Sequence, residues 1–95
     1  MYYLKLSGFI PQDKQLEFEQ TYLFVGVQIP KTCISYSITK DVFQEGVYSF
    51  MSYWSSRSSL QRFEQSPGFR VLSGAFKTLG KLHENVSGEM LQTQD

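Results

Sequence analysis

Two segments, residues 33–42 and 47–54, alternate between two kinds of side chain on either side of a turn, and this pair restricts the possible folds most. A period of two is typical of a β-strand, and the turn residues Gln44, Glu45 and Gly46 suit a short connection between neighbouring strands. The sequence therefore predicts an antiparallel hairpin. The residues expected to share a face within each strand are Ile34, Tyr36 and Ile38, and Tyr48, Phe50, Ser52 and Trp54.

The segments before the hairpin predict a strand followed by a helix. Residues 2–9 alternate in the same way as the hairpin arms, which predicts a first strand. Pro11 suits the first turn of a helix that runs from Gln12 towards Gly26 and Pro30. The residues that recur at helical spacing within it, and that we expect to face the sheet, are Phe18, Tyr22, Val25 and Ile29.

The segments after the hairpin predict a helix in two parts and a last strand. Ser58 and Gln61 have the spacing of a capping box for the first part, and Ser66 followed by Pro67 is typical of a new helix start. Gly80 is a natural end for the second part, and residues 82–86 form a weaker final strand. The inward face of the second part should carry Phe69, Leu72, Phe76 and Leu79.

This order of elements predicts one α+β domain over residues 1–95, with a ferredoxin-like βαββαβ topology and an antiparallel sheet. Both helices should cover one face of the sheet and leave the other face open. We expect this open face to carry Tyr, Phe and Trp side chains, and an apolar sheet face of that kind is not stable in water. The sequence therefore predicts a homodimer that stacks sheet on sheet, forming a dimeric α+β barrel.

The charges of the chain balance, and this sets limits on its partners. Nine Lys and Arg residues stand against nine Asp and Glu residues, so we expect no nucleic-acid partner, because phosphate backbones attract basic surfaces. No run approaches the ~20 apolar residues of a membrane span, and no leader pattern precedes the first strand. We therefore expect a cytoplasmic protein without a membrane partner. Cys33 is the single cysteine, which excludes an intrachain disulfide.

Five residues at the end of the hairpin and in the following helix fit the pattern W-x5-L-x5-S-P-x-F. They are Trp54, Leu60, Ser66, Pro67 and Phe69. In this pattern and in the order of its elements, the chain resembles the antibiotic-biosynthesis monooxygenase family. The resemblance implies a dimeric α+β barrel with a cavity between the sheet and the helices of each protomer.

The resemblance implies several activities, because relatives in this family differ. Some oxygenate quinols or polycyclic phenols without metal or flavin, others degrade haem, and others have no known activity. The haem-degrading branch uses a histidine, a tryptophan and an asparagine, which are replaced here by Ser73, by Phe63 and by Leu6 or Ser7. We therefore expect no haem, no other cofactor and no metal.

Trp54 and His83 are the first candidates for a catalytic site. The indole N–H of Trp54 could bind a substrate oxygen, or the ring could pack between sheet and helix. His83 is the natural general base, because the ordinary pKa of histidine lies near neutrality. It lies on the weakest predicted strand with no carboxylate assigned to it, so the alternative is a surface residue.

Tyr36, Tyr48 and Arg57 complete the set of candidates. Tyr36 and Tyr48 lie on the two arms of the hairpin and could offer hydroxyl groups to a phenolic ligand. The alternative is cross-strand packing or the dimer interface. Arg57, together with Arg70, could stabilise an oxyanion, since guanidinium stays charged and offers directed donors. The alternative is a pair of solvated helix residues.

Two classes of function follow from these observations. The leading hypothesis is cofactor-independent oxygenation of a quinol or another electron-rich aromatic molecule. The alternative is a non-catalytic homodimer that binds a small apolar ligand, or that has a structural or regulatory role with its cavity filled by its own side chains. An open cavity containing Trp54, a tyrosine hydroxyl and a buried Arg or His would favour catalysis. An apolar cavity without polar groups would favour ligand binding, and a filled interior would favour the structural role.

Overall fold

The computed structural model describes residues 1–91, so the last four residues of the predicted domain lie outside the described part. The chain forms four strands in the spatial order β2-β3-β1-β4, with antiparallel neighbours. This confirms the predicted ferredoxin-like α+β fold. The elements are β1 (Tyr2–Phe9), a 3-10 turn (Gln12–Lys14), α1 (Gln15–Gly26), β2 (Cys33–Lys40), β3 (Val47–Trp54), α2 (Arg57–Glu64), α3 (Pro67–Leu79) and β4 (Lys81–Glu89).

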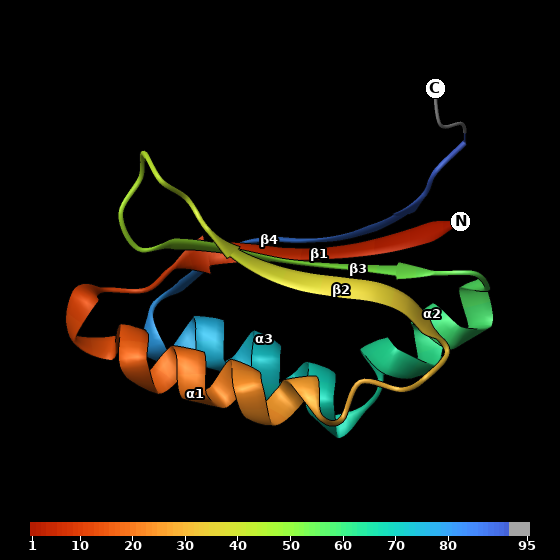
Figure 1. Ribbon diagram of the computed structural model, residues 1–95, viewed down its shortest axis with the longest axis horizontal. Helices are drawn as coiled ribbons and strands as arrows, with labels where there is room; N and C mark the ends of the chain where they lie inside the picture. The colour runs from red at the N-terminus through yellow and green to blue at the C-terminus, as the bar shows by residue number, and fades with distance from the viewer. Residues whose placement is uncertain (92–95) are drawn as a thin grey trace.

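All three α-helices lie on one side of the sheet and leave the other side open (Figure 1). The space between the layers is filled by aromatic and aliphatic side chains. Phe18 of α1 contacts the rings of Tyr48 and Phe76 at centroid distances of 4.8 and 4.7 Å. Side chains with no exposed surface come from every layer and include Leu4, Leu6, Phe18, Phe50, Trp54, Leu72 and Phe76.

The prediction that the open sheet face carries the Phe and Trp side chains is wrong. Tyr48, Phe50 and Trp54 of β3 point towards the helices and are buried. The residues of β3 that face the open side instead are Val47, Ser49, Met51 and Tyr53. This follows from the greater apolar area of the aromatic residues, whose burial under the helices stabilises the fold more.

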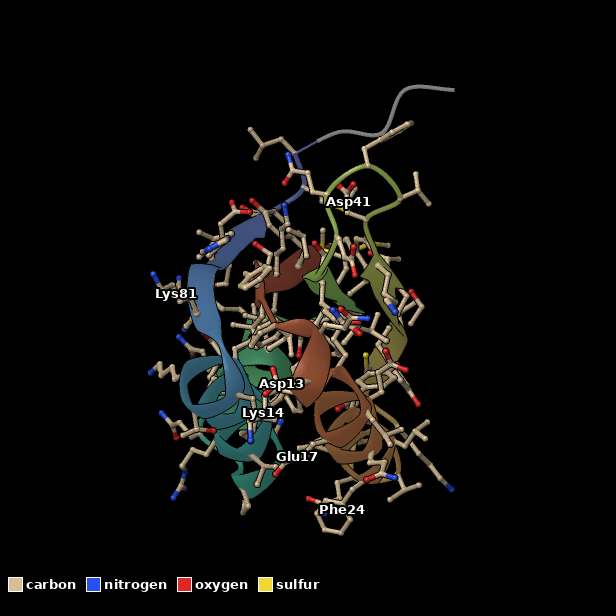
Figure 2. All side chains as sticks on the ribbon, turned by 90° about the vertical axis from the view of Figure 1, so that its left-hand side faces the viewer. Asp13, Lys14, Glu17, Phe24, Asp41 and Lys81 are labelled. Carbon is tan, nitrogen blue, oxygen red and sulfur yellow. The ribbon has the colours of Figure 1, made fainter. Side chains whose placement is uncertain are left out.

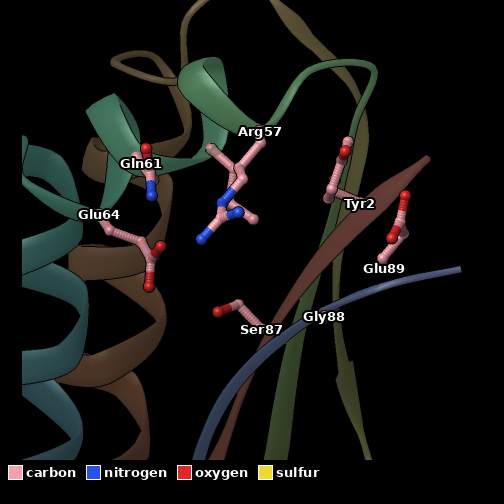
Figure 3. Close-up of a pocket in the computed structure, with 8 residues that line it drawn as sticks. Tyr2, Arg57, Gln61, Glu64, Ser87, Gly88 and Glu89 are labelled. Carbon is pink, nitrogen blue, oxygen red and sulfur yellow. The ribbon is translucent and has the colours of Figure 1, made fainter.

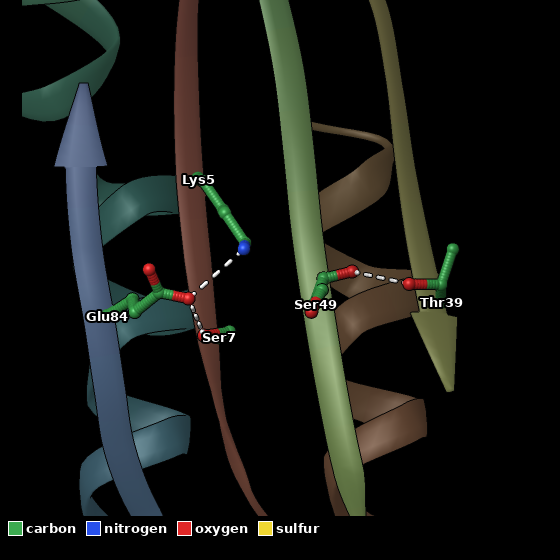
Figure 4. A network of polar contacts seen from close by, with 5 residues as sticks. All are labelled: Lys5, Ser7, Thr39, Ser49 and Glu84. Carbon is green, nitrogen blue, oxygen red and sulfur yellow. Dashed lines mark hydrogen bonds and ion pairs between the residues drawn. The ribbon is translucent and has the colours of Figure 1, made fainter. Parts of the chain in front are cut away.

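The open face is a mixed surface. Lys5 and Ser7 of β1 both contact the Glu84 carboxylate of β4, at 3.1 and 2.9 Å (Figure 4). The register of the sheet places Tyr3 and Met51 on the same face. Tyr3 and Met51 are half-buried, so apolar area surrounds a central polar network. The predicted face-to-face dimer would therefore have to bury both kinds of group.

Two bulges change which side chains share a face. The register between β2 and β3 shifts between Cys33 and Ser35, so Cys33 pairs with Trp54 while Tyr36 pairs with Ser52. Cys33 therefore shares the helix side with Tyr36, and Ile34 is 53% exposed, contrary to the predicted alternation. A second shift in the pairing of β1 with β4 leaves His83 without a partner in the register. An extra residue in one strand is what a β-bulge inserts.

The ends of several elements also differ from the predictions. The N-cap of α2 is Ser56, whose hydroxyl accepts the backbone N–H of Ser59 at 3.1 Å, and the capping box predicted from Ser58 is wrong. Ser66 caps α3 as predicted, with Pro67 in its first turn. β2 ends at Lys40 rather than at residue 42. β4 runs to Glu89, three residues beyond the prediction, because all of β1 is available to pair with it.

Candidate functional site

Three hollows of similar size open on the surface of the described residues, and the space between sheet and helices is filled. The largest, of about 370 Å³, lies between α1 and β2. A second, of about 300 Å³, lies between α2 and β4. A third, of about 290 Å³, lies where the chain leaves α1 and passes α2, near Gln28 and Arg62. Ligands commonly bind in hollows of this volume.

The hollow between α1 and β2, called here the α1–β2 hollow, combines apolar walls with charged groups at one end. Successive turns of α1 place several side chains on the flank that faces β2. The hairpin register brings Lys40 opposite Tyr48. The lining residues are Glu19, Tyr22, Leu23, Ile38, Thr39, Lys40 and Tyr48.

The charged end of this hollow is a cluster of a phenol, a carboxylate and an ammonium group. The Tyr48 hydroxyl donates a hydrogen bond to Oε2 of Glu19. Lys40 Nζ lies 3.4 Å from the same oxygen and 5.5 Å above the centre of the Tyr48 ring. Both contacts of Glu19 within residues 1–91 use Oε2, so Oε1 is available to accept a hydrogen bond from a ligand.

The protonation states in this cluster follow from burial and hydrogen bonding. Burial raises the pKa of the Tyr48 phenol, and the neighbouring Glu19 carboxylate raises it further. The Tyr48 hydrogen bond, assisted by Lys40, lowers the pKa of Glu19. At neutral pH the phenol is therefore a donor and the carboxylate is charged. This arrangement can accept a hydrogen bond from a phenolic ligand and hold a negative charge beside an ammonium group.

The hollow between α2 and β4 is polar and contains Arg57. Figure 3 shows Arg57 pointing from the start of α2 into the space towards which Gln61 and Glu64 also point, with Ser87 on the opposite wall. Arg57 is exposed. A guanidinium beside carboxylates is suited to polar ligands, whereas it provides little apolar wall for an aromatic ring.

The remaining candidates lie away from these two clusters. Trp54 has no exposed surface, its ring lies 5.1 Å from that of Phe63, and its Nε1 donates to Ser52 Oγ at 2.9 Å. The Tyr36 hydroxyl donates to the carbonyl oxygen of Gly26 at 3.3 Å. His83 is exposed on β4. The structure therefore brings no two of the five predicted residues into one hollow.

Sequence reasoning named Tyr48 as a site candidate and missed the other six lining residues of the α1–β2 hollow, which are Glu19, Tyr22, Leu23, Ile38, Thr39 and Lys40. Glu19 and Tyr22 are three residues apart, so they share a helix face, and counting back from the turn places Lys40 opposite Tyr48. These signals existed in the sequence, but they identify a site only once α1 is known to lie beside β2.

Residues 1–91 contain neither a candidate metal site nor a candidate membrane-spanning helix. No group of three or more His, Cys, Asp or Glu side chains in this part of the chain could hold a metal ion. No helix formed by the described residues has the length and apolar character needed to cross a membrane.

Comparison with known proteins gives one family and many similar folds. The family model for antibiotic biosynthesis monooxygenases matches residues 5–73. A protein from Deinococcus radiodurans, provisionally assigned as such a monooxygenase, shares 15% sequence identity with this chain and has a TM-score of 0.85. The structural match covers 100% of this chain and 97% of the Deinococcus chain. A variant of SnoaB, a cofactor-independent oxygenase from Streptomyces nogalater, shares 16% sequence identity with this chain and has a TM-score of 0.76. The structural match covers 97% of this chain and 95% of the SnoaB chain.

A third similar structure carries no assigned activity. A conserved protein from Methanosarcina mazei is 13% identical with a TM-score of 0.75, covering 92% of this chain and 87% of its own. At these identities the likeness shows the fold alone. A search of curated proteins found no match.

Proposed function

The chain belongs to the antibiotic biosynthesis monooxygenase family, and on that basis we propose that it oxygenates a quinol or another electron-rich aromatic molecule without a metal or flavin. Fold similarity to SnoaB, a cofactor-independent oxygenase, is compatible with this proposal. The family match by itself does not select a site within the chain.

The α1–β2 hollow carries the proposal, because it joins an apolar wall to a charged carboxylate. Tyr22, Leu23 and Ile38 offer a surface on which an aromatic ring can lie. Glu19 Oε1 then accepts the proton of the ligand hydroxyl, and the Lys40 ammonium stabilises the resulting phenolate. The Tyr48 hydroxyl already donates a hydrogen bond to Glu19, which supports a hydrogen bond between this carboxylate and a phenolic ligand.

The phenolate supplies the electrons of the proposed reaction. An electron-rich phenolate can reduce dioxygen directly, after which one oxygen atom bonds to the ring and the other leaves as water. The two electrons that water formation requires come from the aromatic ligand, which ends oxidised. The protein contributes the proton acceptor and the fixed positive charge.

The functional unit we propose is a homodimer joined through the open sheet faces. Tyr3, Met51, Tyr53 and Val86 supply apolar area on that face, and Val86 is 43% exposed in the single chain. Stacking two such faces would remove this area from water.

The filled interior favours a second function, a non-catalytic dimer with a structural or regulatory role. The indole N–H of Trp54 is already bound to Ser52, so this residue has no free polar group to offer a substrate. The rings of Phe63 and Phe69 occupy the adjoining space with centroids 5.8 Å apart.

Oxygen consumption with a panel of hydroquinones and naphthoquinols, with a chelator present, tests the proposal. We expect protein-dependent uptake that Glu19→Gln lowers by about 10²- to 10⁴-fold, as for loss of a general base. Glu17→Gln is the matched control, because Glu17 is exposed on the same helix outside the hollow. His83→Ala and Trp54→Phe should retain activity as long as the protein stays folded.

Absence of uptake above background for the wild type would refute the oxygenase proposal. Equilibrium dialysis with a redox-inert naphthalene diol ether would then separate the remaining functions. Binding that depends on Leu23 and Ile38 would support a ligand-binding dimer, and no binding would leave the structural or regulatory role.

A further inference from the structure

Helix α1 is apolar on two opposite sides, whereas one side is enough to pack on a sheet. The inner side carries Phe18, Tyr22 and Val25, all buried or half-buried. The outer side carries a second row at steps of three and four residues, which in a helix share a face. This row, called here the outer stripe, consists of Leu16, Gln20, Leu23 and Phe24 of α1 and of Val27, the residue that caps its C-terminal end.

The apolar side chains of the outer stripe are open to water. Leu16 is 70% exposed, Leu23 67%, Phe24 58% and Val27 84%. Figure 2 shows Phe24 pointing away from the sheet, at the outer surface of the helix layer. A helix with apolar residues on both sides is normally covered on both, and a continuous exposed row of this kind marks an interaction surface.

We propose that the outer stripe binds the same stripe of a second copy, with the two helices antiparallel. A two-fold axis midway between residues 21 and 22 places Leu16 against Val27 of the second copy. The same axis places Gln20 against Leu23 of the second copy. Each contact then occurs twice, as an interface with two-fold symmetry requires.

The charges at the two ends of α1 complement each other in this arrangement. Asp13, Lys14 and Glu17 give the N-terminal end a net negative charge, and Lys31 lies just beyond the C-terminal end. Antiparallel pairing brings each acidic end beside the basic end of the other copy, and it also opposes the two helix dipoles favourably. Opposite charges at matching positions favour a second copy over an unrelated partner.

The same charges argue against a lipid surface as the occupant. Amphipathic helices that bind membranes usually carry Lys and Arg along the polar face. The polar residues that flank the outer stripe within α1 are Glu17, Glu19 and Thr21, with no cation among them.

Helix α1 lies on the side of the sheet opposite the open face (Figure 1), and the side chains of the outer stripe are exposed on its outer side. If both interfaces form, sheet-stacked dimers join through α1 into tetramers or longer assemblies. The helix has 12 residues, so the contact is small. Small interfaces give weak association, and we therefore expect assembly that depends on protein concentration.

Sedimentation equilibrium of the full chain from about 10 μM to about 1 mM tests this inference, since weak interfaces dissociate in that range. The wild type should show a weight-average mass that rises about two-fold or more over the mass of Leu16→Glu at the highest concentration. The double variant Leu16→Glu/Val27→Lys should regain the wild-type mass, because each new glutamate meets a new lysine across the axis.

Val71→Glu is the matched control, because it adds the same charge to an exposed valine of α3 that is outside the stripe. It should leave the mass unchanged, and circular dichroism should show all variants folded. Equal masses for wild type and Leu16→Glu would overturn the inference, and so would a double variant that stays dissociated. The mass of Leu16→Glu itself reports the sheet-face dimer, so failure of one interface is distinguishable from failure of the other.

Discussion

Trp54 offers a direct test of the interpretation that its role is structural. The indole has no exposed surface, and its N–H donates to Ser52 Oγ, which is equally buried. Trp54→Phe removes the donor and leaves the Ser52 hydroxyl in a dry environment with one partner fewer, which costs about 1–3 kcal/mol. A residual cavity of about 40 Å³ at about 24 cal/mol per Å³ adds about 1 kcal/mol. We therefore expect a loss of about 2–4 kcal/mol in the free energy of unfolding.

Ser52→Ala provides the second arm of a double-mutant cycle. This change leaves the indole N–H buried without an acceptor and should cost about 1–3 kcal/mol. The double variant replaces both partners by apolar groups, so its loss should be smaller than the sum of the two single losses by about 1–2 kcal/mol. Urea unfolding followed by far-ultraviolet circular dichroism measures all four proteins, because Trp54 is the single tryptophan and its fluorescence is lost in two of them.

Protein concentration must be equal in these measurements, because association through either proposed interface would add to stability. Additive single losses would refute the statement that the Trp54–Ser52 hydrogen bond holds the end of β3 to the core. A Trp54→Phe protein as stable as the wild type would refute the wider reasoning that this side chain is a packing residue.

Three further predictions concern a close approach, a helix cap and an ion pair. Gly80→Ala should cost about 1–3 kcal/mol or more, because a Cβ at this position would overlap the Phe9 carbonyl oxygen. Gly74 has free space around the corresponding position, so Gly74→Ala should stabilise α3 by about 0.5–1 kcal/mol. Thermal unfolding of the two variants measures the difference. Ser56→Ala should lower the free energy of unfolding by about 0.5–2 kcal/mol, and Ser58→Ala should lower it much less, because Ser56 is the N-cap of α2. Urea unfolding measures both losses, and a larger loss for Ser58→Ala would contradict this assignment. Lys5 and Ser7 lower the pKa of Glu84 below 4.5, so its contribution to stability is present above pH 4.5 and disappears as the pH falls through the lowered value. The gap in Tm between wild type and Glu84→Gln should therefore close in acid, and a gap independent of pH would contradict this.

The order of elements could be predicted because each element has its own local period. The alternation around residues 44–46 predicts the hairpin, and the spacing of Phe69, Leu72 and Phe76 predicts the inner face of α3, as observed. Periods of two and of three to four depend on residues close in the chain. They are therefore visible without knowledge of the partner surface.

The side that each strand turns to the helices could not be predicted in the same way. Alternation in β3 separates Phe50 and Trp54 from Ser49 and Met51, but either set can face the helices until the packing is known. The bulges beside Ile34 and His83 then reverse the alternation locally. Such bulges arise from pairing with another strand, and one extra residue moves every later side chain to the other face.

The candidate site was predicted only in part for a related reason. Tyr48 was named from its place in the hairpin, but its partner Glu19 lies 29 residues earlier in the chain. Trp54 was prominent as the single tryptophan and as part of the family pattern, yet its hydrogen bond to Ser52 lies inside the core. A side chain's rarity does not indicate whether its polar atom is free.

The amino-acid sequence by itself determined the fold class, the order of strands and helices, and the relation to the monooxygenase family, because these depend on local periodicity and on a short pattern. The tertiary structure decided that the aromatic residues fill the interior, that Glu19, Lys40 and Tyr48 meet at one hollow, and that α1 turns a second apolar stripe to water. Burial and electrostatic contact depend on distances between segments far apart in the chain. Those distances exist only after the sheet and the helix layer have packed together.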